Sequence, residues 1–128
     1  MSDWVWIRSD VALAVHDRQL AEHGGPSGIR DIGAFESALA RAQNLAAYGE
    51  PDAAALAAAY AFGVARDHAF VDGNKRTAWV LARQFLLING FTVQVEAPDS
   101  IAIMLALAGG ALTEDELANW FRERIAAV

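Results

Sequence analysis

The sequence predicts an all-α protein of about six helices around a buried central pair, with at most one small pair of strands. Two observations carry this prediction. Alanine-rich and leucine-rich segments repeat apolar residues at helical spacing, and glycines, prolines and helix-capping residues separate these segments. A chain of 128 residues suits one compact domain, so residues 1–128 are expected to form a single domain.

The first two elements are expected to be a short strand and a helix. The alternating segment DWVWIR, residues 3–8, favours a strand with Trp4 and Trp6 on one face. Ser9 is the expected N-cap of a helix over residues 10–23. The glycine pair that follows would end this helix.

The histidines of this first helix, His16 and His23, are expected at its surface. Residues 24–31 contain several glycines and a proline, which favour a connecting loop. Asp31 is the expected cap of a second helix that extends through residues 34–48. The apolar stripe of the first helix comprises Val11, Leu13 or Ala14, Val15 and Leu20.

The third and fourth helices are expected to form the buried central pair. Pro51 fits the first position of the third helix, which runs to residue 67 and is apolar on nearly every side. The fourth helix covers residues 75–89 and ends at the Asn89–Gly90 pair. Its buried stripe comprises Ala78, Leu81, Ala82, Phe85 and Leu86.

The last third of the chain predicts one strand and two helices. The alternating segment FTVQVE, residues 91–96, is the best strand candidate. Pro98 opens a helix through residue 108. Thr113 and Glu116 form the T-x-x-E pattern of a capping box, which predicts a last helix over residues 114–127.

The composition excludes several classes of function. The chain has no cysteine, which rules out disulfides, thiolate metal sites and cysteine nucleophiles. Its net charge of -6 disfavours nucleic-acid binding, because phosphate contacts need clustered cations. No apolar run is long enough to span a bilayer, and the first residues lack the features of a signal peptide, so a cytoplasmic protein is expected.

A polar segment, HAFVDGNKRTAW at residues 68–79, joins the two apolar central helices. The fourth helix begins within it, and a helix N-terminus presents unpaired N–H groups that bind anions such as phosphate. The amides of Gly73, Asn74 and Lys75 are expected to line such a site. The side chains of Lys75 and Arg76 oppose the helix dipole there, which favours an anionic partner.

Three further side chains near this segment each have two interpretations. His68 can act as a general base that takes a proton from an incoming hydroxyl, or it can be a core histidine bonded to a backbone carbonyl. Asp72 can hold Mg²⁺ against phosphate oxygens, or it can simply cap the helix. Arg66 can contact a phosphate or a partner protein, or it can be a cation that the C-terminal helix dipole favours.

The segment HAFVDGNKRTA resembles the signature of the Fic/Doc family, H-x-F-x-D/E-G-N-x-R. The match is closest to the Doc (death-on-curing) branch, which has N-K-R-T-A. The upstream segment GIRDIGAFESALARAQN is similar to the segment that this family carries before its central helices. The length and the helix order also fit the whole chain.

This resemblance implies the Fic fold, with His68 as the general base, Asp72 holding Mg²⁺, the amides of residues 73–75 binding nucleotide phosphates, and Arg76 contacting phosphate. Doc proteins are toxins of type II toxin–antitoxin modules. They use ATP to phosphorylate a threonine of elongation factor Tu and so stop translation. Their antitoxin has a flexible segment that folds onto the toxin, and we expect it in apolar grooves around the last helices. Trp120 and Phe121 either lie near such a groove or pack in the core, and core packing is the favoured role for both.

Departures from the family pattern distinguish between three functions. Most Fic enzymes transfer AMP, and they carry a glycine where this chain has Lys75 and a second arginine where it has Trp79. In the Doc branch, this lysine is thought to reverse the nucleotide, so that the γ-phosphate meets the target. The lysine therefore favours a kinase over an AMP transferase. The intact His68, Asp72 and Arg76 argue against an inactive member that only binds antitoxin.

Overall fold

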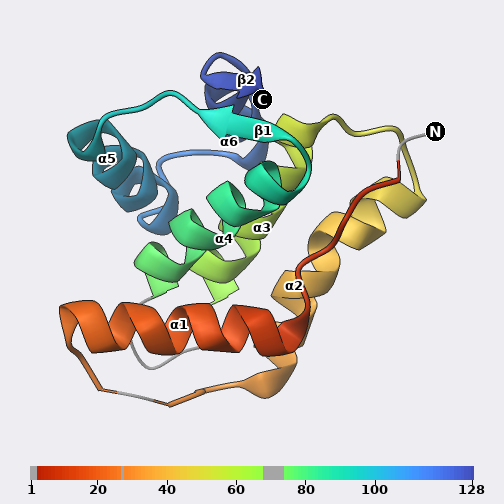
Figure 1. The fold of residues 1–128 in the computed structure, drawn as a ribbon. Coiled ribbons are helices and arrows are strands. Elements are labelled where there is room, and N and C mark those ends of the chain that lie inside the picture. The colour runs from red at the N-terminus through yellow and green to blue at the C-terminus, as the bar shows by residue number, and fades with distance from the viewer. Residues whose placement is uncertain (1–2, 27, 68–73) are drawn as a thin grey trace.

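The computed structural model describes residues 3–26, 28–67 and 74–128. These ranges hold six helices and one two-stranded antiparallel sheet, which confirms the predicted all-α class (Figure 1). None of these helices is long and apolar enough to cross a lipid bilayer. In chain order the elements are α1 (Ser9–His23), α2 (Ile32–Ala47), α3 (Ala53–Asp67), α4 (Asn74–Ile88), β1 (Phe91–Val93), α5 (Ala97–Ala108), α6 (Glu114–Arg122) and β2 (Ile125–Ala127).

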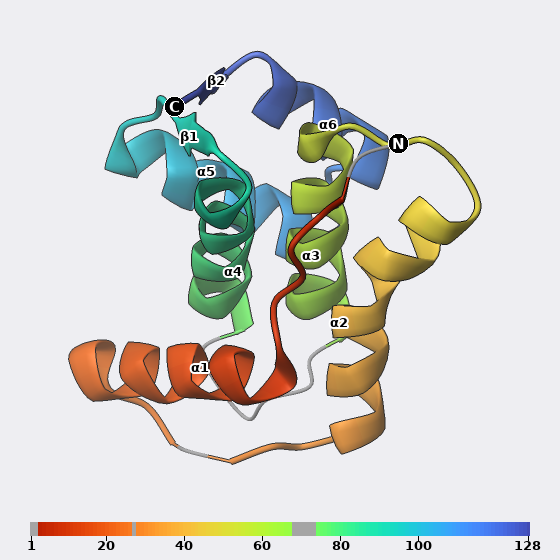
Figure 2. The ribbon, with the colours of Figure 1, turned by 45° about the vertical axis from the view of Figure 1, so that its right-hand side comes forward.

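Helices α3 and α4 form the buried centre, as predicted. They run side by side, and α1 crosses the end of the pair at which α3 ends and α4 begins (Figures 1 and 2). Helices α2 and α6 pack against α3, and α5 contacts both central helices. Most of α3 is inaccessible to solvent, because its alanines let neighbouring helices approach on several sides.

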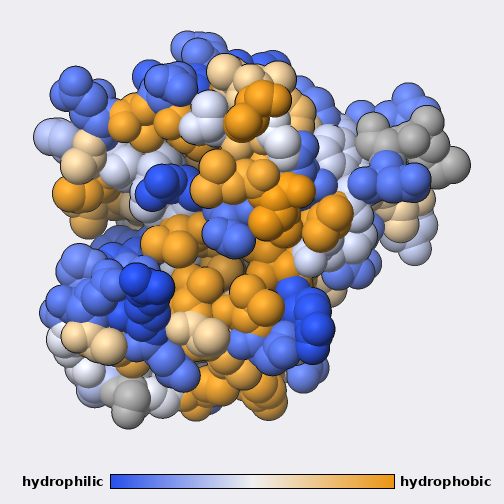
Figure 3. Space-filling model, in the orientation of Figure 1, coloured by the Kyte–Doolittle hydropathy of each residue, from blue (hydrophilic) through white to orange (hydrophobic). Residues whose placement is uncertain are grey.

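The exposed surface is divided by polarity. Apolar side chains gather over the middle of the face drawn in Figure 3, where α4 and β1 lie. Hydrophilic side chains cover the C-terminal half of α1 on the same face.

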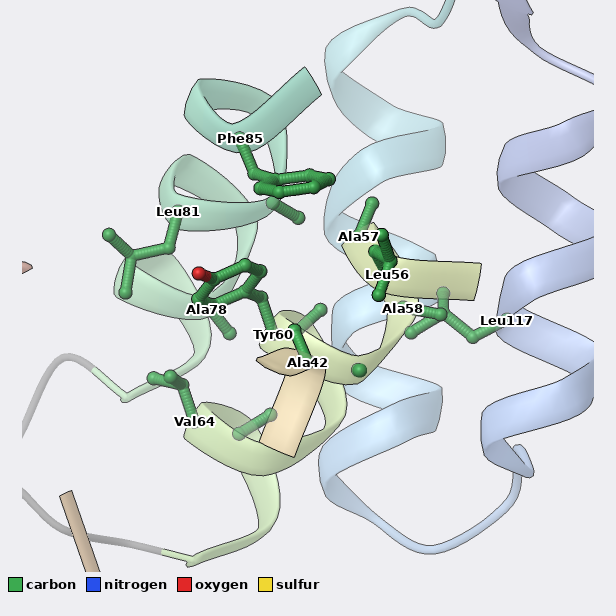
Figure 4. Close-up of a cluster of buried hydrophobic side chains, with 14 of the residues drawn as sticks. Ala42, Leu56, Ala57, Ala58, Tyr60, Val64, Ala78, Leu81, Phe85 and Leu117 are labelled. Carbon is green, nitrogen blue, oxygen red and sulfur yellow. The ribbon is translucent and has the colours of Figure 1, made fainter. Parts of the chain in front are cut away.

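Side chains from all six described helices form the core, and Figure 4 labels members from α2, α3, α4 and α6. Gly63 of α3 lets α2 come close, because a Cβ atom at this position would lie 3.1 Å from the Cα of Ala38. The predicted stripe of α4 is fully buried. The labelled core side chains include Ala42, Leu56, Tyr60, Val64, Leu81, Phe85 and Leu117.

Residues 3–8 do not form the strand that was predicted for them. Side chains satisfy the backbone of this N-terminal arm in place of a neighbouring strand. The Oδ1 atom of Asn89 accepts from the amide of Val5 at 2.9 Å, and its Nδ2 donates to the carbonyl of Val5 at 3.0 Å. The buried amide of Ile7 donates to the Tyr60 hydroxyl at 3.1 Å.

The alternating pattern of residues 3–8 still places both tryptophans on one face, as predicted. Trp4 and Trp6 both pack on Phe85, each with a distance of 5.9 Å between ring centroids. Val5, between them, is exposed. The two indoles therefore share a face, as expected of an extended segment.

Helix α1 differs from its prediction in its start and in its buried face. Arg8, not Ser9, is the N-cap residue, and it makes no side-chain capping bond. His16 is only 2% exposed, so the prediction of a surface position is wrong, whereas His23 is exposed as expected. Val11, which was predicted for the buried stripe, is exposed. The inward face of α1 instead follows the four-residue spacing of Ala12, His16 and Leu20. The buried residues of α1 are Ala12, His16, Gln19 and Leu20.

Three helix starts test the predicted caps. Asp31 caps α2 and the Thr113–Glu116 capping box opens α6, as predicted. Pro51 is not the first residue of α3, which begins two residues later. Asp52 caps this start, because its Oδ1 accepts a 2.9 Å hydrogen bond from the backbone N–H of Ala55.

The C-terminal segment is not one helix, as was predicted. Helix α6 ends at Arg122, and β2 pairs with β1 in an antiparallel register that places Val93 opposite Ile125 and Phe91 opposite Ala127. The strand predicted over FTVQVE is thus confirmed for its first three residues. Its partner gives the backbone of β1 the hydrogen bonds that a lone strand would lack.

Candidate active site

The predicted site lies at one end of the central helix pair. His68, Asp72 and Gly73 fall outside the described residues. The C-terminal end of α3 and the N-terminal end of α4 lie beside each other above α1 (Figure 2). The structure therefore places Arg66 at one end of the connecting segment and residues 74–76 at the other.

The first turn of α4 carries cations and no carboxylate. The helix is 15 residues long and begins at Asn74, so its N-terminal dipole is well developed. Lys75 is exposed and Arg76 is partly exposed in this turn. Positive charge at this end of a helix is unfavourable by itself and becomes favourable when an anion binds. A phosphate group would therefore suit this turn.

Arg76 has hydrogen-bonding capacity that the structure leaves unused. Its Nη2 donates to the carbonyl of Gly24, the C-cap residue of α1, over a long 3.4 Å. Its Nε is buried and has no acceptor among the residues that the structure describes. Buried N–H groups without acceptors are uncommon and costly in native proteins. An anionic ligand beside this guanidinium would satisfy the unused donor.

The next residue, Thr77, was given no role by the sequence. Its side chain is fully buried, and within the described ranges its hydroxyl has no hydrogen-bond partner. A helical threonine commonly bonds the carbonyl four residues earlier, and here that residue lies outside the described residues. The motif does not indicate that this hydroxyl is buried, because burial depends on neighbouring helices that are distant in the sequence.

A mainly apolar groove of about 150 Å³ opens beside these cations, between α4 and α5. Ile101 and Leu105 on its α5 side are 60% and 55% exposed and lie one helical turn apart. Apolar grooves were expected around the last helices, and this one lies along α5, where the spacing of Ile101 and Leu105 is its sequence signal. The groove is lined by Lys75, Arg76, Trp79, Ser100, Ile101, Met104 and Leu105.

Trp79 is held in this groove by aromatic neighbours from α6. Its ring stacks on Phe121 at 6.1 Å between centroids, with 10° between the planes, and meets Trp120 edge-on at 6.0 Å. Phe121 is fully buried. The two aromatic residues of α6 therefore pack behind Trp79 and fix its place beside the first turn of α4.

Arg66 lies in the last turn of α3, where the helix dipole favours a cation. Its guanidinium carbon lies 5.4 Å from the ring centroid of Phe62, and that of Arg41 lies 4.9 Å from the same ring. The Nε of Arg41 donates to Glu114 at 2.6 Å. Arg66 is exposed, and both roles predicted for it stay predictions.

Comparisons with known proteins agree with the motif. A model of the Fic/DOC family matches residues 6–86. The chain is 33% identical to the protein kinase doc of Escherichia phage P1 over 117 residues, which are 91% of this chain and 92% of that protein. It is 49% identical to the toxin Doc of Mycolicibacterium smegmatis over 70 residues, which are 52% of this chain and 53% of that protein.

Proposed function

The chain belongs to the Fic/DOC family, and we propose that it is a Doc-type toxin of a type II toxin–antitoxin module, with ATP-dependent protein kinase activity. The proposed reaction transfers the γ-phosphate of ATP to a threonine or serine hydroxyl of a translation factor, elongation factor Tu, and so arrests translation. The two relatives support this proposal, since one is named a protein kinase and the other a toxin.

The observation that carries the proposal is the buried Nε of Arg76 at the start of α4, which has no acceptor among the residues that the structure describes. Lys75 adds a second cation to the same turn, which holds no carboxylate. These features suit an anion with several oxygens, and the phosphates of ATP provide them.

We assign the remaining roles from the motif. His68 takes the proton of the attacking hydroxyl as its oxygen bonds to the γ-phosphorus. The bond from that phosphorus to the bridging oxygen breaks, and ADP leaves. The amides of residues 73–75 and the guanidinium of Arg76 hold the phosphates. Asp72 would hold Mg²⁺, which supplies positive charge against the phosphate oxygens when it is bound.

The surroundings of Lys75 support γ-phosphate transfer over AMP transfer. Its side chain lines the groove together with Trp79, whose indole is packed against Phe121. A nucleotide in the AMP-transferring orientation would meet a lysine and an indole where most Fic enzymes offer a glycine and an arginine. We therefore propose the reversed orientation, with the γ-phosphate nearest His68.

We further propose that the antitoxin segment docks as an amphipathic helix in the groove between α4 and α5. Apolar residues of that helix would cover Ile101 and Leu105, and its carboxylates would face Lys75. A helix in this place would also cover the first turn of α4 and so block the nucleotide.

Leu105→Asp should weaken antitoxin binding and leave phosphate transfer intact. Antitoxin binding that is unchanged in this variant would contradict the proposed groove.

The decisive experiment incubates the purified chain with elongation factor Tu and ATP labelled at either the α-phosphate or the γ-phosphate. We expect label on the translation factor from the γ position only, and none with His68→Ala. Transfer from the α position would show that the protein is an AMP transferase. No transfer from either position, together with intact antitoxin binding, would identify an inactive member of the family.

A further inference from the structure

A second hollow, of about 620 Å³, lies at the other end of the central pair from the candidate active site. The N-terminal arm forms one wall with Trp4 and Trp6. The end of α2 and the connector to α3 form the other wall, which includes Glu50. The length of the central helices separates this hollow from the first turn of α4 by roughly 20 Å. It is therefore a separate site.

The arm wall is held in place by contacts with the core. Both indoles are partly buried against Phe85, with centroid distances of 5.9 Å. The side chain of Asn89 holds the backbone of Val5, which lies between them, through two hydrogen bonds. A pocket whose walls are already fixed loses little conformational freedom when a ligand binds.

The residues that line this hollow favour a positively charged ligand. Asp3 and Glu50 both line the hollow, and neither forms an ion pair with any residue in the described ranges. Indole rings attract cations through the negative charge of their faces. On the opposite wall Ala46 and Ala47 have short side chains, which leave room for a ligand body.

We propose that this pocket binds an organic cation, meaning an ammonium or guanidinium group on an aliphatic body. Trp4 and Trp6 would contact the aliphatic body and the positive charge, and Asp3 and Glu50 would compensate that charge. The volume lies in the range of small-molecule sites, which is about 300–1,000 Å³. Neither the family motif nor the proposed kinase reaction uses any of these residues, so the two proposals stand or fall separately.

The test uses the full chain and follows the indole N–H signals by NMR during titration with tetramethylammonium chloride. The chain has four tryptophans. Trp4→Phe and Trp6→Phe assign the two pocket signals, and the signals of Trp79 and Trp120 serve as internal controls. We expect saturable shifts of the pocket signals only. Sodium chloride at equal ionic strength and the neutral analogue 3,3-dimethyl-1-butanol should produce no such shifts.

Charge variants complete the test. Glu50→Gln should weaken tetramethylammonium binding by roughly threefold to tenfold. The matched variant Glu36→Gln removes an exposed carboxylate from the start of α2 and should leave the affinity unchanged. The proposal is overturned by shifts that do not saturate, by an equal response to the neutral analogue, or by equal affinity in both variants. Titrations with spermidine and with N-acetyl-arginine-methylamide then show whether a free amine or a protein side chain binds more tightly.

Discussion

Arg122, at the end of α6, binds the carboxylate of Asp52, the residue that caps α3, through hydrogen bonds of 2.7 and 2.9 Å. This pair joins the first turn of a central helix to the last turn of α6. The hydrogen bonds from Arg122 are the largest cause of the lowered pKa of the Asp52 carboxyl, and the cap bond from Ala55 lowers the pKa further.

The lowered pKa gives the first prediction. A carboxyl whose folded-state pKa lies below its unfolded value stabilises the fold above the unfolded pKa, near 4, and loses this contribution as the pH falls further. Asp52→Asn keeps a capping oxygen and removes the charge. Because both partners are about half exposed, the expected loss at pH 7 is about 0.5–1 kcal/mol.

Urea unfolding at pH 7 and pH 3 measures this difference, which should shrink at the lower pH. Asp31→Asn is the control, since Asp31 caps α2 and has no arginine partner among the described residues. A difference between wild type and Asp52→Asn that stays constant with pH would refute the assignment.

The second prediction concerns the unused donor of Arg76. Arg76→Lys keeps the charge but removes the buried Nε–H, so ATP binding should weaken by at least about tenfold. Calorimetric titration with ATP measures the effect. Arg8→Lys is the control, because Arg8 is an exposed arginine at the far end of α1. Equal ATP affinity in the wild type and in Arg76→Lys would remove Arg76 from the site.

The third prediction separates the two interpretations of Asp72. Asparagine caps a helix about as well as aspartate, but it is a poor substitute for a carboxylate that binds Mg²⁺. If Asp72 holds the ion, Asp72→Asn should weaken ATP binding strongly with magnesium and little with EDTA. Calorimetry under both conditions measures this. Equal changes in both would leave capping as the role of Asp72.

The fourth prediction tests the close contact between α2 and α3. Gly63→Val would force side-chain atoms against the backbone of Ala38, and we expect a loss of about 1–3 kcal/mol of unfolding free energy. Gly49→Val is a suitable control, because a Cβ there lies an ordinary 3.7 Å from its nearest neighbour. Urea unfolding of both variants gives the comparison. Equal stability of the two would mean that α2 can move away from α3 at little cost.

The sequence predicted best what is decided locally. The apolar stripe that includes Leu81 and Phe85 and the caps at Asp31 and Thr113 depend on residues within a few turns, and the structure confirms them. The anion site is predicted from a contiguous motif in the same way and stays a prediction, but α4 does begin at Asn74, so residues 74–76 lie at a helix N-terminus as expected.

The structural predictions that were wrong concern residues whose packing or hydrogen-bond partners are distant in the sequence. The arm at residues 3–8 bonds to Asn89, and no local pattern indicates that an amide side chain will replace a strand. Residues 125–127 have a helical composition, but pairing with β1 overrides it. The burial of His16 follows from how α1 packs across α4, which the apolar spacing within α1 did not indicate.

The two hydrogen bonds between Asn89 and Val5 also limit how early the N-terminal arm can pack during synthesis. Val5 is made before its partner Asn89, which follows 84 residues later. At bacterial and eukaryotic elongation rates of about 5–20 residues per second, this gap lasts at least several seconds. Throughout that time, Trp4 and Trp6 lack the Phe85 ring on which they finally pack. The growing chain therefore carries two indoles without their aromatic packing partner until the end of α4 has been made.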